Sequence, residues 1–258
     1  FTLTFAGFTS ATAYDVTTNL DSILAIPGSL RHVLIDMAAD ITPEPHTITF
    51  RNTTAQTITL LSDLPSIDKQ VTFEAPVSLT ITGGLNVFAL RIGNSGNLKL
   101  SPNIVVSNAQ NENGGTLSLQ SPLTFRVSNY SQLSTGTLNI ALTGAACSND
   151  NLSVTGAVSL AGNLIVSRDA DCKPSLGKVF TIISNNQNDP ITGTFNGLAE
   201  GASVAVGEYK FAISYKGGGG SNDVILTVTS VPLIAQTITF PALLTPRNVG
   251  DAAALGAS

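Results

Sequence analysis

From residue 46 onward the chain is a series of short runs in which apolar residues alternate with Thr, Ser or Asn. Examples are "HTITF" (46–50), "SLTITG" (78–83), "NLKL" (97–100), "GTLSL" (115–119) and "NLIVSR" (163–168). Because alternate side chains of a strand point to opposite faces, each run predicts a short β-strand with one buried and one solvated face. Gly, Asn, Pro and Ser separate the runs, as they do at turns. So many short strands restrict the fold to a β-sandwich, a barrel or a solenoid.

The runs also resemble one another, as in "TITF", "TITL", "VTF" and "LTITG". One coil of a solenoid cannot bury its apolar face alone, so coils with similar strands stack on their neighbours. The Asn-rich turns "GNSGN" and "SNAQNENGG" suit tight corners, because Asn and Gly tolerate left-handed backbone. We therefore predict an all-β fold, a right-handed parallel β-helix (solenoid) with its coils over residues 46–145. A plain antiparallel sandwich is the alternative.

One segment, "PGSLRHVLIDMAAD" (27–40), has helical rather than strand periodicity. Its apolar stripe consists of Leu30, Leu34, Met37 and Ala38. The letters "PGS" supply a start signal and "TPEP" a stop signal. Terminal coils of a solenoid need a cover, because uncovered strand edges invite aggregation. We expect residues 1–45 to form an N-terminal strand and a capping helix.

Beyond about residue 145 the strands become longer and the turn signals more regular. The longer runs include "KVFTIIS" (178–184), "YKFAISY" (209–215) and "DVILTVT" (223–229). We expect residues 146–230 to form a C-terminal β-rich module that closes the far end. Residues 231–258 are expected to be an extended tail, or a linker to a following domain.

Composition excludes some classes of partner. With 11% charged and 43% hydrophobic residues, the chain does not have the low hydrophobicity and high net charge of a disordered protein. A net charge of −5, with 12 Lys and Arg residues spread thinly, argues against nucleic acid as a partner. No apolar run approaches the ~20 residues of a membrane helix, so we expect no membrane insertion.

The chain contains two cysteines, Cys147 and Cys172. They are candidates for one disulfide, which implies an oxidising compartment. Such a bridge contributes about 3 kcal/mol in the chain-entropy model. The alternative is a pair of free buried thiols.

Two stretches carry a resemblance. "GSLRHVLIDMAADITPEPHTITF", followed by "TITLLSDLPSIDKQVTFEAPVSLTITGG", resembles the N-terminal part of large secreted bacterial surface proteins. These carry a "SLREAI" helix and then parallel β-helix coils. Ser29, Leu30 and Arg31 match the helix motif, whereas His32 and Val33 replace its Glu and Ala. Residues 150–229 are similar to a module common in autotransporter-like proteins.

The tail "QTITFPALLTPRNVGDAAALGAS" resembles the first strand of a bacterial Ig-like repeat. Together the resemblances imply an extracellular or cell-surface location and a shaft or adhesin. They imply nothing specific about an activity.

The distribution of acidic residues gives no support to catalysis. Polysaccharide-cleaving β-helix enzymes need two or three acids, or a cation with a base, converging on adjacent coils. The acids of region 46–168 are Asp63, Asp68, Glu74, Glu112 and Asp150. None of these acids is paired closely in sequence, and His32 and His46 lie far from any acidic cluster. We predict no enzyme activity, catalytic residue, metal site or cofactor.

We therefore expect a non-enzymatic extracellular structural protein, a rigid rod that self-associates head to tail into fibres. Strand-like termini can add to the open sheet of another copy through main-chain hydrogen bonds. The expected inter-subunit contacts are Phe1, Thr2, Leu3, Thr4, Phe5, Thr237, Ile238, Thr239 and Phe240. The alternatives are an adhesin that binds glycan or a host surface, and a polysaccharide lyase or hydrolase of β-helix fold.

Overall fold

The computed structural model describes residues 12–83, 88, 90–93, 96–100, 104–112, 114–119, 124–186 and 189–233. Over these residues the protein is mostly β-strand and contains one α-helix, α1 (Leu30–Ala39). The predicted all-β class is therefore confirmed. The expected inter-subunit segments Phe1–Phe5 and Thr237–Phe240 lie outside the described residues.

The strands form two sheets. The first sheet contains, in spatial order, β1 (Ala13–Val16), β2 (His46–Phe50), β4 (Gln70–Glu74), β7 (Asn97–Leu100), β9 (Thr116–Leu119) and β11 (Thr137–Thr143), with β12 (Ser148–Asn149) and β15 (Asn163–Arg168) both paired to β11. All of its pairings are parallel except that between β11 and β12.

The second sheet runs alongside the first. Its parallel strands are β3 (Gln56–Thr59), β5 (Leu79–Thr82), β6 (Leu90–Ile92), β8 (Ile104–Asn111), β10 (Thr124–Gln132), β13 (Asn151–Val154), β14 (Val158–Leu160), β16 (Val179–Asn185) and β17 (Ile191–Gly193). The long strands β8 and β10 each pair twice on one side, first with β5 or β13 and further along with β6 or β14. The second sheet thus has two columns of strands.

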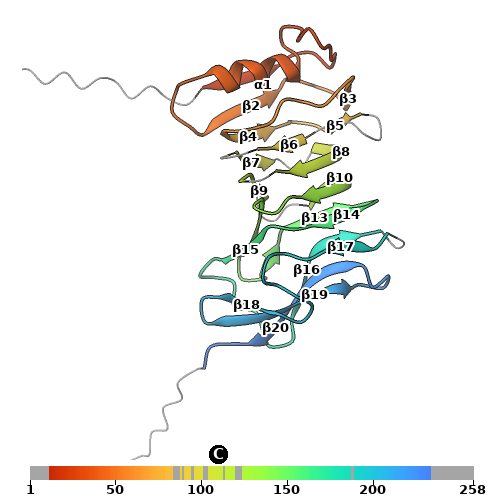
Figure 1. Cartoon of the computed structure of the whole chain (residues 1–258). Coiled ribbons are helices and arrows are strands. Elements are labelled where there is room, and N and C mark those ends of the chain that lie inside the picture. Colours follow the sequence, from red (N-terminus) through yellow and green to blue (C-terminus); the bar gives the residue numbers. More distant parts are fainter. Residues whose placement is uncertain are drawn as a thin grey trace, which may run out of the picture.

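Along most of the stack the chain passes from one sheet to the other, and each new strand pairs with its predecessor in the same sheet. Figure 1 shows the resulting stack of strands, which extends from α1 to the strands β18 (Ser203–Val206), β19 (Tyr209–Gly217) and β20 (Asp223–Ser230). Parallel pairing requires such a crossover between partners, because a tight hairpin joins only antiparallel strands.

The core is built from residues that occupy equivalent positions in successive strands. Leu98 pairs in register with Val71 before it and Leu117 after it, and Leu117 pairs with Leu138, which pairs with Leu164. The three central leucines of this ladder have no exposed surface. The alternation in "NLKL", "GTLSL" and "GTLNIAL" therefore places the leucines between the sheets, where each contributes about 1.5–3 kcal/mol by burial.

A glycine directly precedes each of the strands β7, β9 and β11, because backbone segments approach one another closely there. A Cβ on Gly96 would lie 1.9 Å from the carbonyl oxygen of Ile67, and one on Gly115 would lie 2.2 Å from that of Ile92. Neither glycine position therefore has room for a side chain. Each glycine N–H instead closes a turn, as from Gly115 to the carbonyl of Glu112 at 3.1 Å.

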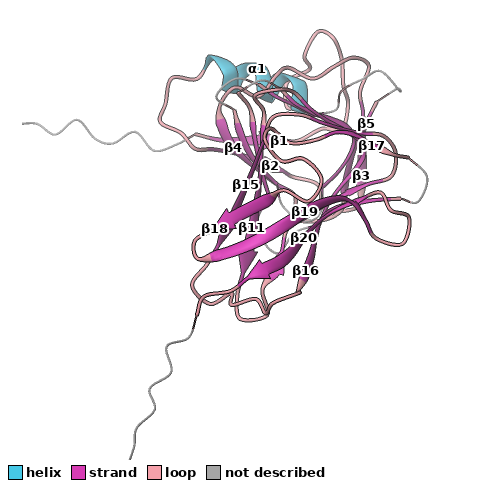
Figure 2. Cartoon of the chain, turned by 60° about the horizontal axis from the view of Figure 1, so that its bottom comes forward, coloured by secondary structure: helices cyan, strands magenta, loops and turns pink. Residues whose placement is uncertain are grey.

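The helix α1 lies across the N-terminal end of the stack (Figure 2). Ser29 is its N-cap and accepts a hydrogen bond from the His32 N–H at 3.2 Å. Leu30, Leu34 and Met37 are buried as predicted, but Ala38 is exposed and Val33 is buried in its place. The expected stripe was thus wrong in one position, since positions i+3 and i+4 both face the strands.

The opposite end is closed by antiparallel strands of the second sheet. After β16 the chain adds β18, β19 and β20, with β20 antiparallel to β16 and β19, and β19 antiparallel to β18. Parallel pairing continues as far as β17. The change from parallel to antiparallel pairing thus lies within residues 146–230, the expected C-terminal module. In the described part of the chain, no helix is long and apolar enough to cross a membrane.

Candidate functional site at the two ends of the strand stack

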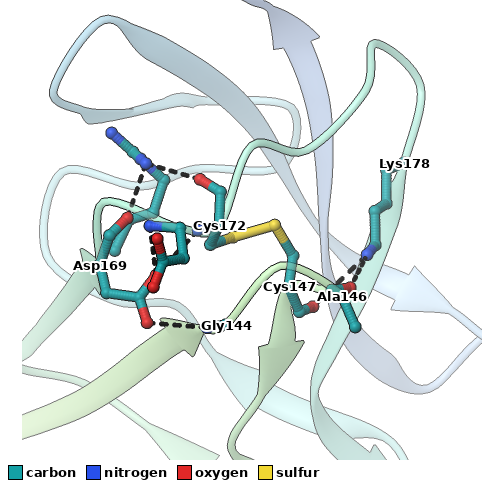
Figure 3. The surroundings of a disulfide bond; sticks show 8 residues. Gly144, Ala146, Cys147, Asp169, Cys172 and Lys178 are labelled. Atoms are coloured by element: carbon teal, nitrogen blue, oxygen red, sulfur yellow. Dashed lines mark hydrogen bonds between the residues drawn. A yellow bond between two sulfur atoms is a disulfide. The ribbon is translucent and has the colours of Figure 1, made fainter.

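A disulfide joins Cys147, in the turn after β11, to Cys172, in the loop after β15 (Figure 3). The Cα atoms are 4.6 Å apart, and both cysteines are buried. The bridge connects two segments that follow neighbouring parallel strands of the first sheet. It therefore fixes the loop at the C-terminal end of that sheet.

Asp169 holds the same loop through its carboxylate. It accepts hydrogen bonds from the backbone N–H groups of Gly144 at 2.7 Å, Cys172 at 2.8 Å and Asp171 at 3.1 Å. These bonds, that from Gly144 first, hold the pKa of Asp169 below its ordinary value. On the other side of the disulfide, Lys178 donates to the Ala146 carbonyl at 2.6 Å (Figure 3).

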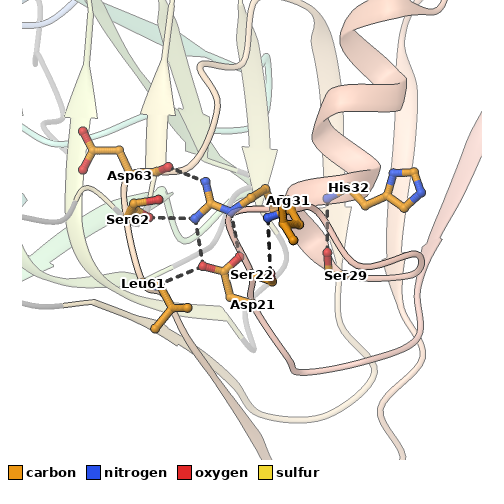
Figure 4. Close-up of polar contacts among 9 residues, drawn as sticks. Asp21, Ser22, Ser29, Arg31, His32, Leu61, Ser62 and Asp63 are labelled. Carbon is orange, nitrogen blue, oxygen red and sulfur yellow. Dashed lines mark hydrogen bonds and ion pairs between the residues drawn. The ribbon is translucent and has the colours of Figure 1, made fainter.

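The N-terminal end is held by Arg31, whose guanidinium lies between the helix and the loop after β3 (Figure 4). Its Nε and Nη2 atoms donate to the two carboxylate oxygens of Asp21, each at 2.8 Å. Nη1 donates to the Asp63 carbonyl at 2.6 Å and Nη2 to the Ser62 carbonyl at 2.8 Å. Because Arg31 is only 6% exposed, this network links α1 to the strand stack inside the protein.

This geometry gives each residue of the "SLR" triplet a structural role. Ser29 caps the helix, Leu30 enters the core, and Arg31 forms the ion pair. Sequence reasoning missed Asp21, ten residues before its partner, although a buried arginine requires a carboxylate or several carbonyls nearby. Burial raises the pKa of Asp21, but hydrogen bonds from Arg31 and from the Leu61 N–H outweigh it and hold the pKa below its ordinary value.

A second polar group closes the C-terminal end of the helix. The Tyr14 hydroxyl donates to Asp40 Oδ2 at 2.5 Å, and the Thr42 N–H donates to Asp40 Oδ1 at 2.8 Å. The hydrogen bond from Tyr14 is the largest cause that holds the pKa of Asp40 well below its ordinary range. Burial, together with this carboxylate, raises the pKa of Tyr14. His46 is fully buried, with its ring centroid 6.0 Å from that of Tyr14.

The histidines each lie beside one carboxylate. His46 Nδ1 is 4.0 Å from Asp40 Oδ2, and His32 Nδ1 is 3.3 Å from Asp36 Oδ2 on the helix surface. Within the described ranges, no group of three or more His, Cys, Asp or Glu side chains is placed to hold a metal ion.

The structure brings two acids together that are far apart in sequence. Glu112 forms an ion pair with Arg91, with a 2.8 Å bond from Nε, and accepts a 2.8 Å hydrogen bond from the Ser66 hydroxyl. Burial and the nearby charge of Glu112 raise the pKa of Asp68, whereas Arg91 lowers it. Asp68 Oδ1 and the Ser66 hydroxyl both lie within 2.2 Å of the place a Cβ on Gly93 would occupy. These polar groups therefore lie together beside Gly93.

The other acids of this region have separate structural contacts. Asp63 accepts a hydrogen bond from the Phe88 N–H at 2.9 Å, and the buried Asp150 accepts one from the Ala141 N–H at 2.9 Å. Glu74 ends β4 on its exposed side. They do not join the group formed by Asp68, Glu112 and Arg91.

The polar networks at the two ends are thus the Arg31–Asp21 network and the disulfide with Asp169, and the group formed by Ser66, Asp68, Arg91 and Glu112 lies between them. The spacing of "DADC" is typical of an Asp that binds backbone N–H groups two and three residues later, and it could have indicated Asp169. Comparison with protein-family models and with curated proteins finds no match for this sequence.

Proposed function

We propose that the protein is a non-enzymatic structural rod of the extracellular space or cell surface, built as a right-handed parallel β-helix. The observation that carries the proposal is the unbroken in-register ladder from Val71 to Leu164 through five successive strands of one sheet. A stack of this kind has stiffness along its axis, because every coil is bonded to the coil on each side. The right hand follows from the strong general preference for right-handed crossovers between parallel strands.

The ends of the stack support a rod that is stable as a separate unit. At one end α1 is anchored by Arg31, and at the other the antiparallel strands β18, β19 and β20 follow the last parallel strands. Covered ends shield the apolar core of the terminal strands from water. Any specific joining of rods therefore falls to the segments beyond the covered ends.

An oxidising location is supported by the bridge between Cys147 and Cys172. Disulfides persist in secreted and cell-surface proteins and are rare in reducing compartments. The resemblance of the 29–31 triplet and of residues 150–229 to secreted bacterial surface proteins agrees with such a location.

Self-association is the finer part of the proposal. The strand-like segments Phe1–Phe5 and Thr237–Phe240 join copies head to tail by adding to a neighbour's sheet. Contacts between unlike ends do not close on themselves, so they generate a filament rather than a ring.

Electron microscopy combined with small-angle X-ray scattering tests both parts with the whole chain. We expect elongated particles at low concentration and end-to-end chains of rods at high concentration. Replacing Phe5 and Phe240 by Asp should abolish the chains and leave the single rods. Compact particles would overturn the rod. Rods that stay single at every concentration would overturn self-association alone.

A further inference from the structure

A cavity of about 650 Å³ opens at the C-terminal end of β15, within the size range of sites for small ligands. It is bounded on one side by the loop after β15 and on the other by the start of β19 and the residues after β20. The residues that line it include Arg168, Lys173, Leu176, Glu208, Tyr209 and Pro232.

The loop that forms one wall is held in place before any ligand arrives. Cys172 carries the disulfide. Asp169, three residues earlier, accepts hydrogen bonds from three backbone N–H groups. At the far end of the loop, Lys178 donates a hydrogen bond to the Ala146 carbonyl. A wall fixed in this way loses little conformational entropy on binding, which favours affinity.

Arg168 is the best-oriented polar group in the cavity. Its Nη1 donates to the carbonyls of Asp169 at 2.6 Å and Cys172 at 2.5 Å, and its Cζ lies 4.8 Å from the centre of the Tyr209 ring. These contacts fix the plane of the guanidinium. Its Nε and Nη2 groups make no hydrogen bond to the residues that the structure describes. The side chain therefore presents unused donors in a fixed orientation.

The remaining charges and the apolar lining indicate the kind of ligand. Lys173 and Glu208 form no ion pair with a described residue, so the cavity carries one net positive charge with Arg168. Leu176 is 65% exposed, and Pro232 lies among the lining residues. An exposed apolar surface next to an unpaired guanidinium suits a ligand with an apolar body and one acidic group.

We propose that this cavity binds an organic carboxylate with an apolar body. The carboxylate pairs with the free donors of Arg168, since the guanidinium fork matches the two carboxylate oxygens. The apolar body packs against Leu176 and Pro232. This inference is independent of the structural role, because the rod requires no occupant of the cavity.

The test is NMR titration of the whole oxidised chain with three probes: benzoate, benzamide and glucuronate. Benzoate should bind most tightly and shift the amide signals of Lys173, Leu176 and Tyr209. Benzamide, which has the same body without the charge, and glucuronate, which has the charge on a polar body, should each bind more weakly. Equal affinity for benzoate and benzamide, a preference for glucuronate, or shifts centred elsewhere would overturn the proposal.

Variants separate the site from general effects. Arg168→Gln should weaken benzoate binding about tenfold, as expected for loss of a charged hydrogen bond. Arg126→Gln, the same substitution at an exposed position of β10, should leave it unchanged. Leu176→Asp changes only an exposed side chain and places a negative charge at the wall, so it should weaken binding without affecting folding. Unchanged binding in Leu176→Asp, or equal losses in both arginine variants, would contradict the assignment.

Discussion

Arg31 and Asp21 form a two-bonded ion pair in which the aspartate side chain is only 1% exposed. The pair joins the loop that precedes α1 to the helix itself, and Arg31 then reaches the carbonyls of Ser62 and Asp63. Of the four hydrogen bonds that this guanidinium donates, two hold the loop before α1 and two attach the helix to the strand stack.

Replacing Arg31 by Ala should destabilise the protein by about 3–5 kcal/mol, because it leaves the Asp21 carboxylate and two carbonyls without their partner. The matched control is Arg51→Ala. Arg51 pairs with Asp15 at 2.8 Å, but the two side chains are 58% and 47% exposed, so its loss should cost at most about 1 kcal/mol. Urea unfolding of the two variants measures the difference. Similar midpoints would contradict a structural role for the buried pair.

The same ion pair should make the free energy of unfolding depend on pH. The pKa of Asp21 is lowered in the folded protein from its ordinary value of 3.8, so the unfolded chain takes up the proton first as pH falls. The stabilisation from this carboxylate is present above about pH 4 and is lost as pH falls through the folded pKa. Asp21→Asn should be less stable at neutral pH and should lose less stability between pH 5 and pH 3. An identical loss in variant and parent would refute the linkage.

Truncating a buried leucine of the in-register ladder should lower the free energy of unfolding far more than truncating an exposed side chain of the same strand. Leu98 has no exposed surface, whereas its neighbour Lys99 points to solvent. Leu98→Ala should destabilise the protein by about 2–5 kcal/mol through lost burial and a cavity between the sheets. Lys99→Ala should change stability by no more than about 0.5 kcal/mol. Thermal or urea denaturation of the two variants gives the comparison, and equal costs would contradict the in-register stacking.

The short strands and their buried faces were predictable because both follow local rules. Alternation in "HTITF" and "NLKL" marks the inward residues, and the serine at position 29 marks the start of α1. Both inferences need only neighbouring residues. The point at which the pairing becomes antiparallel was not predictable in this way, because β20 has the same alternation as the parallel strands.

Contacts between distant segments could not be predicted from patterns among neighbouring residues. Ser66 and Glu112 are 46 positions apart but share a hydrogen bond, because Ile67 pairs with Ile92 and Ile92 pairs with Asn111. Gln132 is 1% exposed and donates to the carbonyls of Gly136, Ala161 and Asn163. Glutamine is mostly exposed in proteins, but these three carbonyls provide partners for a buried amide here.

Glycine at the corner before β9 should be required for close stacking. A Cβ on Gly115 would lie 2.2 Å from the Ile92 carbonyl oxygen, and that carbonyl belongs to rigid backbone. Gly115→Ala should therefore destabilise by about 1–3 kcal/mol through overpacking. Gly219 has nothing within 4 Å of its Cβ position, so Gly219→Ala is the matched control and should be nearly neutral. Equal stabilities of the two variants would show that the corner has room to relax.

Reduction of the disulfide should destabilise the closed loop. The bridge spans a sequence separation of 25 residues, so its loss is worth about 3 kcal/mol in the chain-entropy model. We expect a lower urea midpoint for the reduced protein and for the variant with both Cys147→Ser and Cys172→Ser. A reductant should not affect that variant, which provides the control.

The hydrogen bonds of Asp169 allow a further distinction. Its carboxylate holds the N–H groups of Gly144 and Cys172 independently of the sulfur bond. If the bridge acts mainly on the unfolded chain, these two amides should stay more protected from hydrogen exchange than their neighbours in the reduced protein. If the bridge instead holds the folded loop together, reduction should remove their protection below the unfolding midpoint. Asp169→Asn should weaken protection in either redox state, because a neutral amide is a poorer acceptor than a carboxylate.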